Sequence, residues 1–350
     1  MFDYDEKKLV NKVIDENYLN EGDYVKKFEK KIASYLGVKY CVCVTSGTAA
    51  ISLALMTLGL LPDDEVIIPN FTFIATANAV KLAGAKPIFV DINFDRFDIS
   101  IKQIKKKITK KTKVIIPVDV NGRSADYKSL EFFKRKFGLR IISDSSEGFG
   151  SSFEGKKIGT FGDMSCFSFS AAKTISTGQG GAIVTNSKIF YNRLLELKDQ
   201  GRRQRGTGGN DLHPVLGFNF KYTNLQAAVG LAQLKKLSSR LKKFKRRDFL
   251  YKKYLSNNQQ VILPKTYDDE VLQWFDILIP NKQKVVKYLR QKNIDVRSFW
   301  FPINKQKTYK SKEKFSISDK VSAYGLWLPS CFDITEDEIQ QVCNSINEIL

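Results

Sequence analysis

The sequence predicts an α/β protein with a large, mostly parallel sheet, and three observations indicate this class. Four short apolar runs, at residues 65–69, 86–91, 113–119 and 140–144, alternate with helical segments. Strands that are apolar throughout are typical of parallel sheets that are buried on both faces and joined by right-handed helical crossovers. Hydrophobic residues make up 43% of the 350 residues, which is enough for a large core.

The residues before this series predict two helices, a strand and a third helix. We expect a leading helix and loop over residues 1–20, an amphipathic helix over 24–35, and a strand over 40–44 that is followed by an apolar helix over 49–61. Between the last two lie Thr45, Ser46, Gly47 and Thr48. A glycine before a helix N-terminus is typical of an anion site, while Ser and Thr there also act as N-caps, so both functions stay open.

Three of the four apolar runs end in an aspartate, namely Asp91, Asp119 and Asp144. Ligands of open α/β sheets bind beyond the carboxyl ends of the strands, so each aspartate is a candidate ligand contact. The alternative is that each carboxylate caps the helix that follows it.

Lys173 lies in a glycine-rich segment between two further apolar runs, at residues 166–170 and 182–185. We expect a short strand, a tight return and a second strand. A lysine held between two buried strands is partly desolvated, and desolvation lowers the pKa of a lysine and favours Schiff-base chemistry. A solvated turn lysine is the alternative.

The C-terminal part predicts a second, smaller domain. A long helix is expected from residue 224 to about 254, followed by α+β segments at 270–279, 282–292 and 295–302. Thr335 and Glu338 have the spacing of a capping box before a last helix over 336–349. We therefore predict a large α/β domain over residues 1–240 and a small α+β domain over 241–350.

The formal net charge of +20 comes largely from basic clusters at residues 102–113, 235–247 and 282–292. Apolar residues interleave these clusters at helical spacing, which indicates amphipathic helices with solvated basic faces. No nucleic-acid recognition motif accompanies the charge, so we expect no nucleic-acid partner. A positive field would also favour an anionic small substrate.

The five cysteines and the single histidine have no metal-ligand spacing, so we expect neither a metal site nor a disulfide framework. No apolar run reaches the length of a membrane span, and the charged N-terminus lacks a signal-peptide pattern. These features predict a cytoplasmic protein without a membrane partner.

Six motifs, together with their order and spacing, resemble the DegT/DnrJ/EryC1/StrS sugar aminotransferases: residues 45–50, 69–76, 144–150, 162–169, 173–181 and 217–228. The resemblance extends from about residue 17 to the C-terminus. It implies the fold type I architecture of pyridoxal 5′-phosphate enzymes, with a large, mostly parallel sheet domain and a smaller α+β C-terminal domain.

The resemblance implies catalytic roles for two residues. Lys173 matches the lysine that forms a Schiff base with pyridoxal phosphate. Asp144 matches the carboxylate that pairs with the pyridine nitrogen, where a negative charge keeps the nitrogen protonated and makes the ring an electron sink. Glu147 lies where many relatives have Gln, and some Glu, near the cofactor's phenolic oxygen.

The same comparison implies further cofactor contacts. Gly47, Thr48 and Ser168 match contacts to the cofactor's phosphate, and Phe73 matches an aromatic ring stacked on the cofactor. Asn219 lies where the family reaches across a homodimer interface to the partner's cofactor phosphate.

On the substrate side, Lys221 occupies a position often held by Arg or Asn. Arg297 and Trp300 resemble a motif near the nucleotide sugar. Asp119 and Asn121 depart from the family, which usually has His and Tyr in this loop.

The implied function is transfer of the amino group of L-glutamate to C4 of a nucleotide-linked 4-keto-6-deoxyhexose. The resemblance is nearest to perosamine- and viosamine-type synthases, whose 4-amino-4,6-dideoxy sugars serve polysaccharide biosynthesis. Lys173 argues against the related dehydratase branch, which has a histidine at this position. A C3-specific aminotransferase and a basic, non-enzymatic nucleic-acid-binding protein on the same fold are the alternatives.

Overall fold

A seven-stranded sheet forms the centre of the computed structural model, which describes residues 2–203 and 211–350. The strand order is β1-β9-β8-β5-β4-β2-β3. The strand bounds are β1 Tyr40–Val44, β2 Glu65–Pro69, β3 Lys86–Val90, β4 Thr112–Ile115, β5 Arg140–Asp144, β8 Met164–Ser168 and β9 Gly181–Thr185. Strands β3, β2, β4, β5 and β8 pair in parallel, and β9 pairs antiparallel with β8 and β1. The predicted mostly parallel sheet is confirmed.

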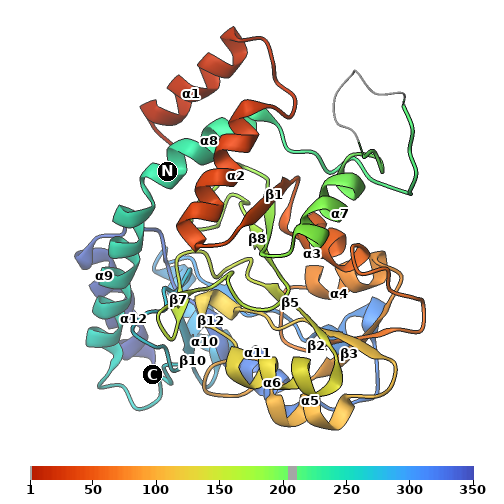
Figure 1. Cartoon of the computed structure of the whole chain (residues 1–350). Helices are drawn as coiled ribbons and strands as arrows, with labels where there is room; N and C mark the ends of the chain where they lie inside the picture. Colours follow the sequence, from red (N-terminus) through yellow and green to blue (C-terminus); the bar gives the residue numbers. More distant parts are fainter. Residues whose placement is uncertain (1, 204–210) are drawn as a thin grey trace.

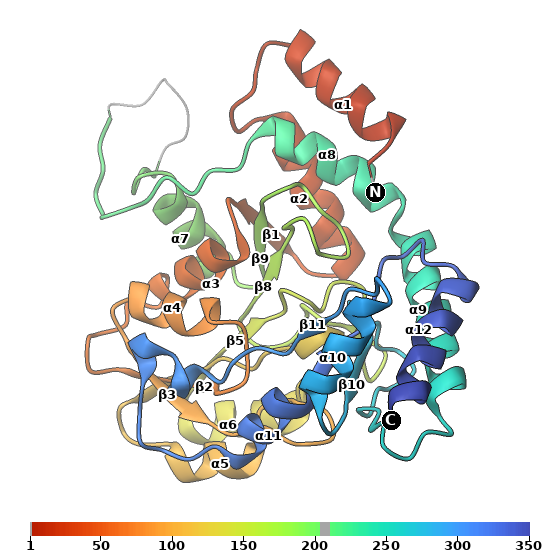
Figure 2. The same ribbon diagram turned by 180° about the vertical axis from the view of Figure 1, so that it is seen from behind.

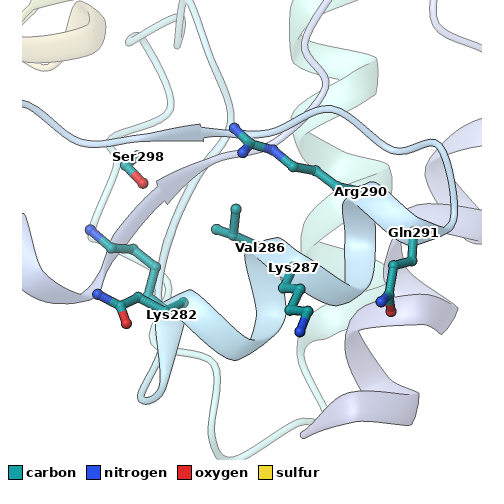
Figure 3. A pocket seen from close by; sticks show the side chains of 7 residues that line it. Lys282, Val286, Lys287, Arg290, Gln291 and Ser298 are labelled. Atoms are coloured by element: carbon teal, nitrogen blue, oxygen red, sulfur yellow. The ribbon is translucent and has the colours of Figure 1, made fainter.

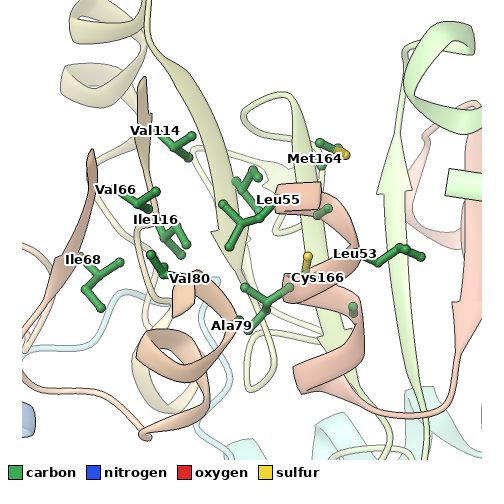
Figure 4. Packing of buried hydrophobic residues seen from close by; sticks show 14 of the residues in the cluster. Leu53, Leu55, Val66, Ile68, Ala79, Val80, Val114, Ile116, Met164 and Cys166 are labelled. Carbon is green, nitrogen blue, oxygen red and sulfur yellow. The ribbon is translucent and has the colours of Figure 1, made fainter. Parts of the chain in front are cut away.

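Helices cover both faces of this sheet (Figures 1 and 2). They are α3 Gly47–Met56, α4 Ala75–Leu82 and α7 Lys188–Lys198 on one face, and α5 Ile101–Lys107 and α6 Tyr127–Phe137 on the other. Successive strand residues enter different cores because side chains alternate along a strand. Val66 and Ile68 pack with α3 and α4 (Figure 4), whereas Ile67 packs with α5 and α6. This double burial explains why the strands are apolar throughout.

The predicted helix over residues 224–254 is wrong, because the chain forms two helices there, α8 Asn224–Lys235 and α9 Leu237–Leu255. Helix α8 packs against α1 Tyr4–Asp15 and α2 Asp23–Leu36, whereas α9 packs against α12 Glu336–Ile349. The helices separate at Lys236, whose ammonium group lies 2.8 Å from the carboxylate of Glu6 in α1. The chain therefore bends at Lys236, because α8 and α9 bury their apolar faces against different helices, although the sequence pattern is continuous.

A three-stranded sheet in the order β10-β12-β11 forms the core of the C-terminal part. Its strands are β10 Asp276–Leu278, β11 Arg297–Ser298 and β12 Gly325–Trp327. Helices α9, α12 and α10 Lys282–Gln291 pack around it (Figure 2). The capping box of Thr335 and Glu338 is present at α12, as predicted. The predicted domain boundary at residues 240–241 falls within α9 and stays a prediction.

Short elements complete the fold: strands β6 Ser152–Phe153 and β7 Lys156–Lys157, helix α11 Ser316–Tyr324, and 3-10 helices Val120–Gly122, Ile303–Lys305 and Lys307–Tyr309. Among residues 2–203 and 211–350, no helix combines the length and the apolar character that a membrane crossing requires.

The three strand-terminal aspartates have different roles. Asp91 accepts hydrogen bonds from the backbone N–H groups of Ile317 and Ser318, so it caps α11 and not the helix that follows it in the chain. Asp119 is fully buried and accepts hydrogen bonds from Tyr127, Ser145 and the N–H of Ala125. Asp144 alone of the three lines the cavity described below.

We predict that Asp119 makes the stability of the protein depend on pH. Burial raises the pKa of its carboxyl to about 7, whereas an unfolded aspartate titrates near pH 4. Between about pH 4 and about pH 7 the folded state therefore holds this proton while the unfolded state loses it. The free energy of unfolding falls as pH rises through this range, by up to about 1.4 kcal/mol per pH unit.

The variant Asp119→Asn removes this titration. In urea unfolding, the stability of the wild type relative to Asp119→Asn should decrease between about pH 5 and about pH 8. A stability difference that is equal at both pH values would contradict the buried, protonated carboxyl.

Candidate active site

A cavity of about 350 Å³ lies at the edge of the sheet where β1, β2, β4, β5 and β8 end. Ligands of open α/β sheets bind at this edge. The loops that follow the strands supply most of the wall, and the C-terminal part closes it with Trp274, Arg297 and Trp300.

Nine of the residues singled out from the sequence line this cavity: Gly47, Thr48, Phe73, Asp144, Glu147, Ser168, Lys173, Arg297 and Trp300. These residues are spread over roughly 250 positions of the sequence, and the fold brings them together. Sequence reasoning missed Ser46, Thr72, Ser146, Gln179 and Trp274, which also line it. Ser46 carried a signal as the N-cap candidate before α3, and Thr72, Ser146 and Gln179 lie within the motifs quoted for the family resemblance, whereas Trp274 lies in none of them.

Asn219 and Lys221 do not line the cavity of their own chain. Asn219 is exposed and pairs with Asp199 in an isolated β-bridge. The ammonium group of Lys221 lies 2.6 Å from the carboxylate of Asp199. Their predicted contacts therefore require a second subunit.

One end of the cavity is built to receive an anion. Ser46 caps α3 by accepting a hydrogen bond from the N–H of Ala49 at 3.1 Å, which leaves the N–H groups of Gly47 and Thr48 at the helix start. A Cβ atom on Gly47 would lie 2.8 Å from the Cβ of Ser168, so only glycine permits this close approach. Helix N-termini attract anions through free N–H groups and the helix dipole.

Asp144 is buried, and hydrogen bonds fix its carboxylate. Its Oδ2 accepts from the hydroxyl of Thr76 at 2.7 Å, and its Oδ1 accepts from the N–H of Ser146 at 3.2 Å. Within the described ranges, no cation forms an ion pair with it. A buried carboxylate without a counter-charge is costly, so this group suits a ligand that brings a positive charge.

Lys173 occupies the loop between β8 and β9, as the sequence predicted, and its side chain is 14% exposed. Its Nζ donates a hydrogen bond to Oε1 of Glu147 at 3.1 Å. Nζ also lies 5.2 Å from the centre of the Trp274 ring. The amine is thus held between a carboxylate and an indole. Phe73 also lines the cavity, but its side chain is 53% exposed.

A separate hollow of about 530 Å³ lies beside α10 and has a different chemistry (Figure 3). Its lining consists of Lys282, Gln283, Val286, Lys287, Arg290, Gln291 and Ser298. Ser298 and Arg297 are consecutive in β11, so their side chains point to opposite faces of the small sheet. The hollow is therefore a basic surface on the far side of β11 from the cavity.

The model of the DegT/DnrJ/EryC1/StrS aminotransferase family matches residues 2–347 of this chain. The GDP-perosamine synthase of Escherichia coli O157:H7 is 36% identical over 98% of this chain and 95% of its own length. The enzyme of the same name from Vibrio cholerae is 33% identical, with 98% and 96% covered.

Solved structures agree with this assignment. Helicobacter pylori PseC, an aminotransferase involved in the biosynthesis of pseudaminic acid, superposes with a TM-score of 0.95 at 26% identity and covers 100% of this chain and 97% of its own. S. venezuelae DesV, solved in complex with a ketimine intermediate, has a TM-score of 0.93 at 27% identity, with 98% and 93% covered. This chain therefore belongs to the DegT/DnrJ/EryC1/StrS aminotransferase family and is a pyridoxal-phosphate-dependent transaminase of the fold type I architecture.

Proposed function

We propose that this protein transfers the amino group of L-glutamate to C4 of a nucleotide-linked 4-keto-6-deoxyhexose, giving a 4-amino-4,6-dideoxy sugar nucleotide. The observation that carries the proposal is the meeting of three groups in one cavity: the amine of Lys173, the N-terminus of α3, and the carboxylate of Asp144, which has no ion-pair partner among the described residues. When bound, pyridoxal phosphate supplies the electron sink that lets an amino group leave one carbon and enter another.

The residues of the cavity fit this cofactor. The start of α3, with Gly47, Thr48 and Ser168, would hold its phosphate, and Asp144 would hold its protonated ring nitrogen. Phe73 would cover a face of the ring. The Asp144 carboxylate would then gain the positive partner that no cation of the described residues provides.

Lys173 is the residue that we propose moves protons. An amine on a loop can take a proton from one carbon and return it to another when its base form is accessible. Its partner Glu147, 3.1 Å away, orients the amine toward the cavity and keeps it beside a proton-accepting group. A positioned acid or base of this kind contributes on the order of 10²–10⁴-fold to a rate.

The relatives support a C4 product. Two proteins of 33–36% identity over almost the whole chain carry the name GDP-perosamine synthase, which denotes a 4-amino sugar. The second candidate is a C3-specific enzyme, because a dTDP-3-amino-3,6-dideoxy-alpha-D-galactopyranose transaminase from Aneurinibacillus thermoaerophilus is 30% identical over 97% of this chain and 94% of its own length. Arg297, Trp300 and Lys221 are proposed substrate contacts, and the positive net charge suits an anionic nucleotide.

We further propose a cytoplasmic homodimer in which Asn219 reaches the partner's cofactor phosphate. Asn219 is exposed in its own chain, and the segment that carries it also exposes Leu212 and Leu216, at 66% and 83%. Large exposed apolar side chains on one segment favour a protein partner. In a two-fold dimer each segment would serve the opposite site.

Turnover of a panel of keto-sugars tests the reaction. With L-glutamate, release of 2-oxoglutarate should depend on a nucleotide-linked 4-keto-6-deoxyhexose and should vanish in Lys173→Ala, because the proton carrier is lost. Lys157→Ala is the matched control, since Lys157 also faces an aromatic ring, Tyr35, but lies outside the cavity.

Product NMR should place the new nitrogen on C4. Nitrogen on C3 would establish the second candidate in place of the first. Indifference of the enzyme to every keto-sugar in the panel would contradict the substrate class.

Subunit mixing tests the composite site. Lys173→Ala and Asn219→Asp subunits should each be inactive alone, whereas random exchange at equal amounts should restore about a quarter of the sites, as two-fold symmetry requires. Exchange is followed by native mass spectrometry. If mixed dimers form and no activity returns, each subunit holds a self-contained site.

A further inference from the structure

Trp274 is a residue of the cavity for which no role was predicted from the sequence. Its half-buried ring lines the cavity, and the ring centre lies 5.2 Å from the Nζ atom of Lys173. An indole face at this distance attracts an ammonium group and shields it from solvent. The position of this ring therefore affects the amine on which the proposed chemistry depends.

The side chain of Asn121 holds the backbone of Trp274. The Oδ1 atom of Asn121 accepts a hydrogen bond from the N–H of Trp274 at 2.8 Å, and its Nδ2 donates to the C=O of Trp274 at 2.6 Å. Nδ2 also donates to the carboxylate of Asp276 at 2.8 Å. One amide thus satisfies both polar backbone groups of Trp274.

Asn121 also contacts the second neighbour of the Lys173 amine. Its backbone N–H donates to Oε2 of Glu147 at 2.8 Å, while Oε1 of Glu147 accepts from Lys173. Asn121 is fully buried with φ of 56°, in the left-handed region that few residues other than Gly, Asn and Asp adopt. Gly lacks the amide and Asp lacks the donor, so asparagine uniquely combines the conformation with these hydrogen bonds.

We propose that Asn121 is a positioning residue that fixes Trp274 and Glu147 on two sides of the Lys173 amine, and that Trp274 controls the access of reagents and substrate to this amine. The inference rests on Lys173 being the reactive group of the proposed function. It assigns a purpose to a loop in which the sequence departs from its family.

The surrounding chain has anchors other than the Asn121 amide, including the bond from the N–H of Gln273 to the backbone C=O of Asn121, so loss of the amide should move Trp274 without unfolding the protein. On one side of Trp274, Arg247 donates to the C=O groups of Leu272 and Gln273 at 2.7 and 3.1 Å. On the other side, Arg123 pairs with Asp276 at 2.6 Å.

The test measures the amine itself. In the full-length protein stripped of pyridoxal phosphate, the rate at which acetic anhydride modifies Lys173 is measured by peptide mass spectrometry. Trp274→Leu and Asn121→Gly should each raise this rate about two- to tenfold, the range expected for the loss of a partly buried cation–π contact. Trp274→Phe keeps a ring and should restore most of the protection.

Asn121→Gly keeps the left-handed backbone and the N–H group that faces Glu147, so it removes only the amide. Asn293→Gly is the matched control, because Asn293 has φ of 59° but is exposed at the end of α10. The modification of Lys157 over Tyr35 serves as the internal reference in every variant.

A double-mutant cycle separates positioning from a general loosening of the fold. If Asn121 acts on the amine through Trp274, Asn121→Gly should add no further rate increase in the Trp274→Leu background. A full additional increase there, or a wild-type rate in Asn121→Gly alone, would overturn the role of Asn121, and a wild-type rate in Trp274→Leu would overturn the role of Trp274. If Asn121→Gly does not fold, Asn121→Asp, which loses the donor, replaces it in the cycle.

Because no turnover is measured, failure of this inference is distinguishable from failure of the proposed function. If the wild type shows no keto-sugar reaction but Trp274 and Asn121 protect Lys173 as expected, only the proposed function is refuted. If the wild type catalyses the reaction but Lys173 is no better protected in it than in the variants, only the inference is refuted.

Discussion

The site depends on a buried ion pair between the two parts of the chain, that of Arg123 with Asp276. Both side chains are 1% exposed, and the two terminal guanidinium nitrogens donate to the carboxylate, at 2.7 and 2.6 Å. Removing one partner of such a pair costs about 3–5 kcal/mol, because the other charge stays buried. Since Asp276 begins β10 and Trp274 lies two residues before it, this pair places the C-terminal wall of the cavity against Lys173. A second buried pair, Arg96 with Glu270, fixes the same segment upstream.

Much of the fold followed from local patterns in the sequence. The parallel strands could be predicted because burial on both faces makes each run apolar, as for Ile67 between Val66 and Ile68. The division of the helix at Lys236 could not, because α8 and α9 pack on different partners, which only the tertiary structure determines.

The residues of the site likewise divide into those that local motifs predict and those that they do not. Gly47, Asp144 and Lys173 were predicted because each belongs to a local motif at the end of a strand. Trp274 was missed because its role comes from Asn121, 153 residues away in the chain, and no local pattern connects the two. Asn219 and Lys221 lie outside their own cavity, so their predicted roles depend on the symmetry of a dimer. The basic hollow beside α10 (Figure 3) lies on the far side of β11 from the cavity.

The identity of the amine that holds the cofactor is the most direct question for this site. The protein is loaded with pyridoxal phosphate, reduced with borohydride and digested, and the modified lysine is located by peptide mass spectrometry. The arrangement of Lys173, Asp144 and the start of α3 predicts a phosphopyridoxyl group on Lys173, and none on Lys157, which also lies over an aromatic ring. A label on another lysine, or no label at all, would contradict the proposed site.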